Sequence, residues 1–197
     1  MARLKIPEFV THYHLSDRHP FLNLSDLAET DLEGVRQGLQ ELRRVRDHKR
    51  PFGRKYIEMR RLTEERLRGL FVARGGRPER SAPHYFVLGR SEWFKQLAPH
   101  TKEVVVALND LPSPVTSFTY SDSFEAMGFG ADFGIPRQEA RPYHDRVYLI
   151  DELEAVIGEY GMPRVEYDNY WGTPVERFIE VQLWSDEPVR HLLRTST

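Results

Sequence analysis

Cysteine is absent from the 197 residues of the chain. This absence excludes disulfide scaffolds, cysteine-ligated zinc sites, iron–sulfur clusters and thiol nucleophiles, and it fits a reducing compartment. Long hydrophobic runs are absent as well, because the apolar run 104–108 is far shorter than the roughly 20 residues that span a bilayer. The first residues lack the apolar stretch and cleavage site of a signal peptide. We therefore expect a cytoplasmic protein with no membrane partner.

The common phosphate-binding and catalytic motifs are missing too. No Gly-x-Gly-x-x-Gly follows a predicted strand, and no glycine-rich loop ends in Gly-Lys-Ser or Gly-Lys-Thr. The Gly-x-Ser-x-Gly turn of serine hydrolases and the His-Glu-x-x-His helix of zinc proteases do not occur either. These absences argue against a Rossmann dinucleotide site, a P-loop and a serine-hydrolase triad.

The charges are unevenly distributed, although the net charge is only −2. Residues 36–80 contain fifteen Lys or Arg and six Asp or Glu, whereas the whole chain has 28 basic and 30 acidic residues. Two interpretations stay open. The blocks of opposite charge pair with each other, or the basic segment 36–80 binds phosphates, as in single-stranded DNA or RNA.

Hydrophobic periodicity predicts helices early in the chain and strands late. The first helix is expected to follow an N-cap at Ser25 or Thr30 and to end near residue 46. A second helix is expected over 54–73, and a third from an N-cap at Asp151 to Gly161. A basic loop is expected at 47–53 and an irregular stretch at 121–145. Strands are expected at 8–15, 83–88, 103–108, 116–120, 146–150 and 178–184. This order favours a single α+β domain over 1–197 with a mixed or antiparallel sheet.

The last predicted strand carries a carboxylate in an apolar setting. Alternation places Ile179, Val181 and Leu183 on one face and Phe178, Glu180, Gln182 and Trp184 on the other. A carboxylate between large apolar side chains loses hydration, which raises its pKa or favours a bound partner. The alternative is that Glu180 faces solvent or pairs with an arginine.

An arginine lies within an otherwise apolar helical stripe. Tyr56, Met59, Thr63, Leu67 and Leu70 fall on one side of the predicted helix 54–73, and Arg60 falls among them while Arg61 falls outside. A buried guanidinium needs a carboxylate, carbonyl groups or a phosphate as partner. The alternative is that Arg60 extends along the stripe to water.

Two histidines share one face of the first predicted strand. His12 and His14 are separated by one residue, so both imidazoles point the same way, as in a metal pair. No third ligand follows at a recognisable spacing, so the sequence predicts no metal residues.

Short motifs occur in an order that is similar to a known family. They are Tyr13-His14-Leu15-Ser16, Arg60-Arg61, Ala82-Pro83-His84-Tyr85-Phe86 followed by Gly89-Arg90-Ser91, the hydrophobic run 104–108, Ser117–Asp122, and Ile179-Glu180-Val181-Gln182-Leu183 followed by Glu187-Pro188-Val189. In these motifs, spread over 9–190, the chain resembles the DarT-type DNA ADP-ribosyltransferases.

The resemblance implies a fold, a substrate and a set of site residues. The fold would be ADP-ribosyltransferase-like, a split and mostly antiparallel sheet with N-terminal helices and NAD in the cleft. Glu180 and Arg60 would be catalytic, and His14, Ser16, Arg60, Arg61 and Tyr85 would bind NAD. The acceptor would be single-stranded DNA or RNA held by segment 36–80, and an antitoxin would be a partner.

This hypothesis makes a geometric demand and has two competitors. His14, Arg60 or Arg61, Tyr85 and Glu180 must line one cleft, and a position of His14 on the opposite side of the sheet from Glu180 would contradict it. The competitors are a non-catalytic module that binds an acidic partner, and a metal-dependent phosphoesterase that uses His12 and His14.

Overall fold

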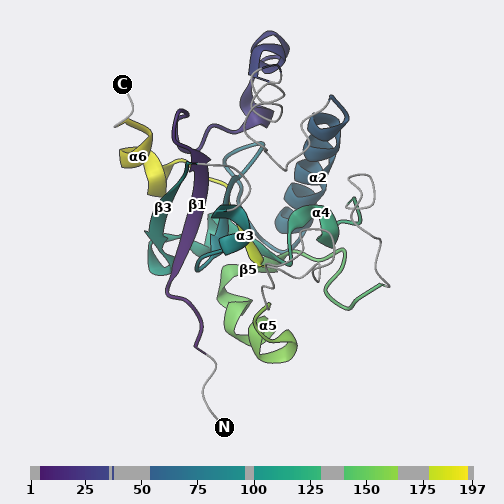
Figure 1. Cartoon of the computed structure of the whole chain (residues 1–197). Coiled ribbons are helices and arrows are strands. Elements are labelled where there is room, and N and C mark those ends of the chain that lie inside the picture. The colour runs from purple at the N-terminus through teal and green to yellow at the C-terminus, as the bar shows by residue number, and fades with distance from the viewer. Residues whose placement is uncertain are drawn as a thin grey trace.

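The structure is a computed structural model that describes residues 5–35, 37, 54–95, 100–129, 140–163 and 178–194. These residues form an α+β structure around one six-stranded antiparallel sheet of order β3-β1-β2-β6-β4-β5. Figure 1 shows α2 beside this sheet and α5 below it, near β5. None of the helices in the described ranges is long and apolar enough to cross a membrane.

The elements have the following bounds. The strands are β1 (Phe9–Leu15), β2 (His84–Leu88), β3 (Thr101–Ala107), β4 (Thr116–Tyr120), β5 (Tyr148–Leu149) and β6 (Ile179–Leu183). The helices are α2 (Arg54–Ala73), α3 (Glu92–Lys95), α4 (Ser123–Ala126), α5 (Leu153–Tyr160) and α6 (Arg190–Arg194). The 3-10 turns are η1 (Leu24–Asp26), η2 (Leu108–Asp110), η3 (Ser113–Val115), η5 (Ile150–Glu152) and η6 (Glu187–Val189).

The predicted strands are confirmed within a few residues, and the helix predicted over 54–73 is confirmed as α2. A helix also begins at residue 29 and is described through residue 35. The rest of the helix predicted up to residue 46 and the basic loop 47–53 lie outside the described residues. The prediction of an irregular stretch at 121–145 is wrong at one place, because α4 forms there with Asp122 as its N-cap.

Three predicted caps are wrong, because nearby groups take over their roles. The N–H of Leu32 donates to the Ala28 carbonyl, so the early helix begins before Thr30. Ser25 lies inside η1, which is capped by Asn23. Asp151 lies inside η5, where its carboxylate accepts a hydrogen bond from Ser113. The Ser113 partner of Asp151 is distant in sequence, whereas the contacts of Leu32 and Asn23 are local.

The register of the strands decides which side chains share a face. Thr11 pairs with Val87, Val87 with Glu180, and Glu180 with Thr119. Side chains of paired residues in antiparallel strands point the same way. This face lies against α2, where the Trp184 ring stacks on Phe71 at 6.1 Å.

The opposite face of the sheet packs into the larger hydrophobic core. Val181 and Leu183 of β6 and Phe118 of β4 pack there with Val156 and Ile157 of α5. The expected division of the last strand is therefore confirmed, with Ile179, Val181 and Leu183 on one face and Glu180 and Gln182 on the other.

The sheet opens between β1 and β2. β1 pairs with β3 along all seven residues, but its register with β2 covers only Val10 and Thr11. Beyond this point His12 Nδ1 donates to the Tyr85 carbonyl across 2.8 Å, since a carbonyl can only accept. A hydrogen bond from a side chain thus replaces the backbone hydrogen bonds between β1 and β2 where the two strands diverge.

Candidate functional site

The opening between β1 and β2 leads into a pocket that we name the Glu180 pocket. Its volume is about 160 Å³. Cavities of about 150 Å³ hold one benzene ring, so the pocket accommodates a group of the size of a single ring. Its walls come from β1, the loop 21–24, α2, β2, α3, α4 and β6, and they include Thr11, His12, Tyr13, Asn23, Tyr56, Arg60, Tyr85, Phe94, Ser123, Phe124 and Glu180.

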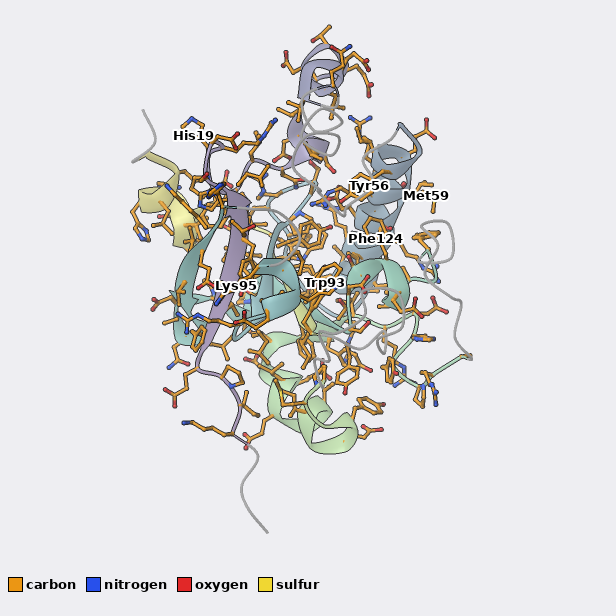
Figure 2. The ribbon with its side chains drawn as sticks, viewed as in Figure 1. His19, Tyr56, Met59, Trp93, Lys95 and Phe124 are labelled. Carbon is orange, nitrogen blue, oxygen red and sulfur yellow. The ribbon has the colours of Figure 1, made fainter. Side chains whose placement is uncertain are left out.

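Aromatic rings make up much of the wall. Tyr56 of α2 and Phe124 of α4 have ring centroids 5.8 Å apart, and Figure 2 labels them on the side of β1 where α2 lies. Phe94 of α3 stacks on Tyr13 at 5.4 Å. Such walls favour a flat ligand, because planar groups stack well on aromatic faces.

Glu180 presents its carboxyl group from β6. The residue is 9% exposed, and Gln182 Nε2 donates to its Oε1 across 3.2 Å. Burial raises the pKa of this carboxyl to about 7, and the nearby Asp122 carboxylate adds to the rise. Hydrogen bonds from Ser123 and Gln182 and the charge of Arg60 act in the opposite direction. The predicted desolvation of Glu180 is therefore confirmed.

Arg60 enters the pocket from α2 and is already paired. Its side chain is 14% exposed, and its Nε lies 3.0 Å from Glu64 Oε1, although the N–H does not point at that oxygen. Its other nitrogens donate to the Tyr56 hydroxyl at 3.2 Å and to Asn23 Oδ1 at 3.4 Å. The alternative that Arg60 extends to water is wrong, because Glu64 offers a carboxylate one turn away on the same stripe.

Tyr85 joins the ion pair to the pocket. The Arg60 guanidinium lies 4.5 Å from the centroid of the Tyr85 ring, and the Tyr85 hydroxyl donates to Glu64 across 3.1 Å. Burial and the Glu64 charge raise the pKa of Tyr85 well above its ordinary value, so the hydroxyl stays protonated. Arg60, Glu64 and Tyr85 thus form one fixed unit.

The charges of this pocket disfavour an anion. Glu64 offsets the single positive charge of Arg60, and Asp122 and Glu180 add negative charge close by. An unpaired phosphate placed here would meet carboxylates rather than a free cation. The arrangement favours a neutral or positively charged planar group, which stacks on the rings and faces Glu180.

The predicted common cleft is only partly present. Arg60, Tyr85 and Glu180 line the Glu180 pocket, whereas His14, Ser16 and Arg61 do not. His14 is three residues beyond Thr11 in the regular strand β1, so its side chain points to the face opposite Glu180. The prediction that His14 and Glu180 share a cleft is wrong, because the register that links β1 to β6 is not encoded locally.

The other two predicted residues have different surroundings. Ser16 is exposed, and its backbone N–H donates to the His100 carbonyl. Arg61 is on the exposed side of α2, where it pairs with Glu29 at 2.6 Å.

His14 borders a second cavity of about 160 Å³ that adjoins the Glu180 pocket. Its walls include Arg18, His19 and Leu22, and His12 borders both hollows. His14 Nδ1 donates to the carbonyls of Leu15 and Arg18, at 2.9 and 3.0 Å. Figure 2 labels His19 on the other side of β1 from Tyr56.

Both ring nitrogens of His12 are occupied. Nδ1 donates to Tyr85, so Nε2 carries no hydrogen and accepts from the Phe21 backbone N–H at 3.0 Å. Burial lowers the pKa of His12 to about 4. No cluster of three or more metal-ligating side chains occurs in the described part of the chain. Metal binding by His12 would require loss of the contact that holds the loop after β1.

The arginines of the described part of segment 36–80 are largely paired within the molecule. Partners outside the segment are Glu29 for Arg61, Asp145 for Arg66, Glu152 for Arg74, and both Asp26 and Asp186 for Arg80. The interpretation that the two charged blocks pair with each other is therefore confirmed for these residues. Arg36, the basic residues of 38–53 and the side chains of Arg54 and Lys55 lie outside the described part of the chain.

Sequence reasoning missed Asn23, Ser123 and Phe124 of the pocket wall and Glu64, which pairs with Arg60. Glu64 stands four residues after Arg60, a spacing that indicates a helical ion pair. Asp122-Ser123-Phe124-Glu125 has the form of a capping box, which signals α4 and places Ser123 and Phe124. Asn23 carries no comparable signal, because its partners Pro83 and Arg60 are distant in sequence.

Comparisons of the chain with protein-family models, with curated proteins and with solved structures find no match. The chemistry of the Glu180 pocket therefore has to be argued from its own geometry.

Proposed function

We propose that the chain is an NAD-dependent ADP-ribosyltransferase and that the Glu180 pocket receives the nicotinamide ribose end of NAD. The observation that carries the proposal is the convergence of a buried carboxyl group, Glu180, with the Tyr85–Arg60 unit in a pocket of single-ring size. A pyridinium ring is planar and positively charged, which suits the aromatic walls and the surrounding carboxylates.

The reaction breaks the bond between the ribose C1′ and the pyridinium nitrogen. The electron pair of that bond moves to the ring, which leaves as neutral nicotinamide, and positive charge develops on the ribose. The Glu180 carboxylate stabilises this charge and orients the ribose hydroxyls. A nucleophilic oxygen or nitrogen of the acceptor then bonds to C1′ and loses its proton to the surroundings.

The proposed site differs from the residue set that the family resemblance implies. Arg60 is offset by Glu64, so its role is to hold Tyr85 and the pocket wall rather than to bind the pyrophosphate. His14, Ser16 and Arg61 have no part in the Glu180 pocket. The position of His14 fails the geometric demand of the family resemblance, so the proposal rests on Glu180, Tyr85 and Arg60 and not on that resemblance. A dinucleotide exceeds the 160 Å³ of the pocket, so its remainder lies outside.

The acceptor is proposed to be single-stranded DNA or RNA, as the resemblance implies. An antitoxin partner belongs to the same proposal. The internal ion pairs of Arg61, Arg66 and Arg74 argue that these three do not form the nucleic-acid surface. A transferase of this kind reaches a base that is out of the stack, which is why a single strand is the natural probe.

The test is incubation of the full chain with NAD labelled in the adenylate, together with single-stranded DNA, single-stranded RNA or a protein mixture. Released nicotinamide and label on a nucleic acid are the expected result. Label on protein alone would assign a protein-modifying transferase. Absence of both nicotinamide release and calorimetric NAD binding would overturn the proposal and favour the non-catalytic module.

A further inference from the structure

A chain of hydrogen bonds runs along one face of the sheet to Glu180. Trp184 Nε1 donates to Ser117 Oγ at 2.9 Å, Ser117 Oγ donates to Gln182 Oε1 at 3.0 Å, and Gln182 Nε2 donates to Glu180 Oε1 at 3.2 Å. Gln182, Ser117 and Trp184 are each fully buried. The side chains lie on the sheet face that carries Glu180, because Gln182 on β6 and Trp184 directly after it follow Glu180 at steps of two.

The direction of this chain is fixed by its ends. Trp184 offers only a donor, so the single hydroxyl hydrogen of Ser117 is free to go to Gln182 Oε1. On the other side, Thr119 donates its hydroxyl hydrogen to the Ser121 carbonyl at 3.0 Å and therefore accepts from Gln182 Nε2 at 3.1 Å. A flipped amide would place Gln182 Oε1 against two acceptors and its NH₂ group against the Ser117 hydrogen.

With this orientation the amide of Gln182 presents one N–H to Thr119 and the other to Glu180, whose Oε1 at 3.2 Å and backbone carbonyl at 3.3 Å both accept it. Such a bond is strongest when the acceptor is ionised, and the buried setting strengthens it further. We infer that Gln182, oriented by Ser117 and Trp184, is a positioning residue that fixes the Glu180 carboxylate in the pocket and favours its charged form. The inference rests on the proposed function only in assigning this carboxylate to catalysis.

A merely structural role predicts something different. Buried polar networks also stabilise folds, so loss of stability in a variant does not discriminate. Direct control of Glu180 is measured by the titration of its carboxyl group. Burial and Asp122 raise the pKa of Glu180, and the bond from Gln182 lowers it, so removal of this bond has a defined sign.

The experiment is an NMR titration of the Glu180 side-chain carboxyl carbon, assigned with Glu180→Gln, in the full chain and its variants. Gln182→Met keeps a long side chain but removes the donor, and Ser117→Ala removes the group that orients the amide. Thr116→Val is the matched control. Thr116 is adjacent to Ser117 in the chain, and its hydroxyl is buried and has no hydrogen-bond partner.

The expected result is a rise in the Glu180 midpoint by about one pH unit in Gln182→Met. A smaller rise is expected in Ser117→Ala, with no change in Thr116→Val. The ascending limb of the kcat profile for nicotinamide release moves by the same amount, and KM for NAD changes little. Should Gln182→Met fail to fold, the Ser117→Ala titration decides alone.

An unchanged midpoint in the folded variants would overturn the inference about Gln182 even if NAD is turned over normally. A shifted midpoint in a protein that releases no nicotinamide would leave the Gln182–Glu180 link intact and would overturn the transferase proposal. The two failures are therefore distinguishable.

Discussion

The Glu180 carboxyl group is balanced between its two protonation states near neutral pH. Burial and the Asp122 charge disfavour the carboxylate, while hydrogen bonds from Ser123 and Gln182 favour it. The resulting pKa of about 7 means that the charged form gains population as the pH rises through neutrality. Chemistry that needs the carboxylate should therefore accelerate with pH across this range.

Glu180→Gln keeps the size of the side chain and removes its negative charge. We expect kcat for nicotinamide release to fall about a hundredfold, because one such electrostatic contact contributes about 3 kcal/mol to transition-state stabilisation. NAD affinity should change less than kcat, because in the ground state the positive charge lies on the pyridinium ring and the ribose beside Glu180 becomes positive only in the transition state. Single-turnover rates and calorimetry measure both quantities.

Glu65→Gln is the matched control, because Glu65 lies on the exposed side of α2. Its rate should equal that of the unchanged chain. A Glu180→Gln protein that turns over NAD at the normal rate would remove Glu180 from the chemistry.

Tyr85 is expected to act through its ring more than through its hydroxyl. Tyr85→Leu removes the aromatic face and should weaken NAD binding by about tenfold, as expected for loss of a stacking contact. Tyr85→Phe keeps the ring and loses only the hydrogen bond to Glu64, so its NAD affinity should stay close to normal. Equal losses in the two variants, measured by calorimetry, would show that the hydroxyl is the group that matters.

At the scale of elements, helix α2 carries a buried ion pair across the pocket wall. Glu64→Gln would leave the Arg60 guanidinium charged and without its carboxylate. Removal of one partner of such a pair costs about 3 kcal/mol of unfolding free energy, whereas replacement of both partners by apolar groups is often neutral. We therefore expect Glu64→Gln to be less stable than the double variant Arg60→Met with Glu64→Leu in urea unfolding. The opposite order would mean that Arg60 finds another partner when Glu64 is lost.

Local sequence predicted the elements better than it predicted their contacts. The alternation in 178–184 correctly placed Glu180 apart from Ile179 and Val181, because side-chain direction in a strand follows from position alone. The position of His14 depends on the register of β1 with β2 and of β2 with β6, which links distant segments. The helical stripe showed that Arg60 is an unusual charged residue among apolar ones. Its partner Glu64 was missed, although the spacing of four residues indicates a helical ion pair.

At the scale of the whole molecule, the uneven charge of the sequence becomes a set of internal ion pairs. α2 and the segment after it are tied to distant acidic residues through Arg66 with Asp145, Arg74 with Glu152 and Arg80 with Asp186. The Arg66 and Arg74 pairs are exposed and contribute at most about 1 kcal/mol each, whereas the Arg80 side chain is only 17% exposed. Their more important consequence is that these arginines are engaged by carboxylates and compete poorly for phosphates.

The dependence of the whole fold on pH should contain two opposing contributions. The pKa of His12 is lowered by burial from 6.5 to about 4, so the unfolded chain binds more protons and stability increases as the pH rises from 4 to 6.5. The pKa of Glu180 is raised by burial from 4.5 to about 7, so the folded chain binds more protons and stability decreases as the pH rises from 4.5 to 7. Each contribution is about 3 kcal/mol, and they cancel over most of this range.

We expect each single variant, compared with the unchanged chain, to reveal the contribution of the group that it removes. The difference in unfolding free energy between Glu180→Gln and the unchanged chain should increase by about 3 kcal/mol between pH 4.5 and 7, because the opposing Glu180 contribution is gone. The difference for His12→Gln should decrease by a similar amount between pH 4 and 6.5. Other titrating groups are common to all three proteins, so these differences, measured by urea unfolding at each pH, isolate the two groups. Parallel pH profiles for the three proteins would mean that neither group has a shifted pKa in the fold. The conclusion that Glu180 is half ionised near neutral pH would then be wrong.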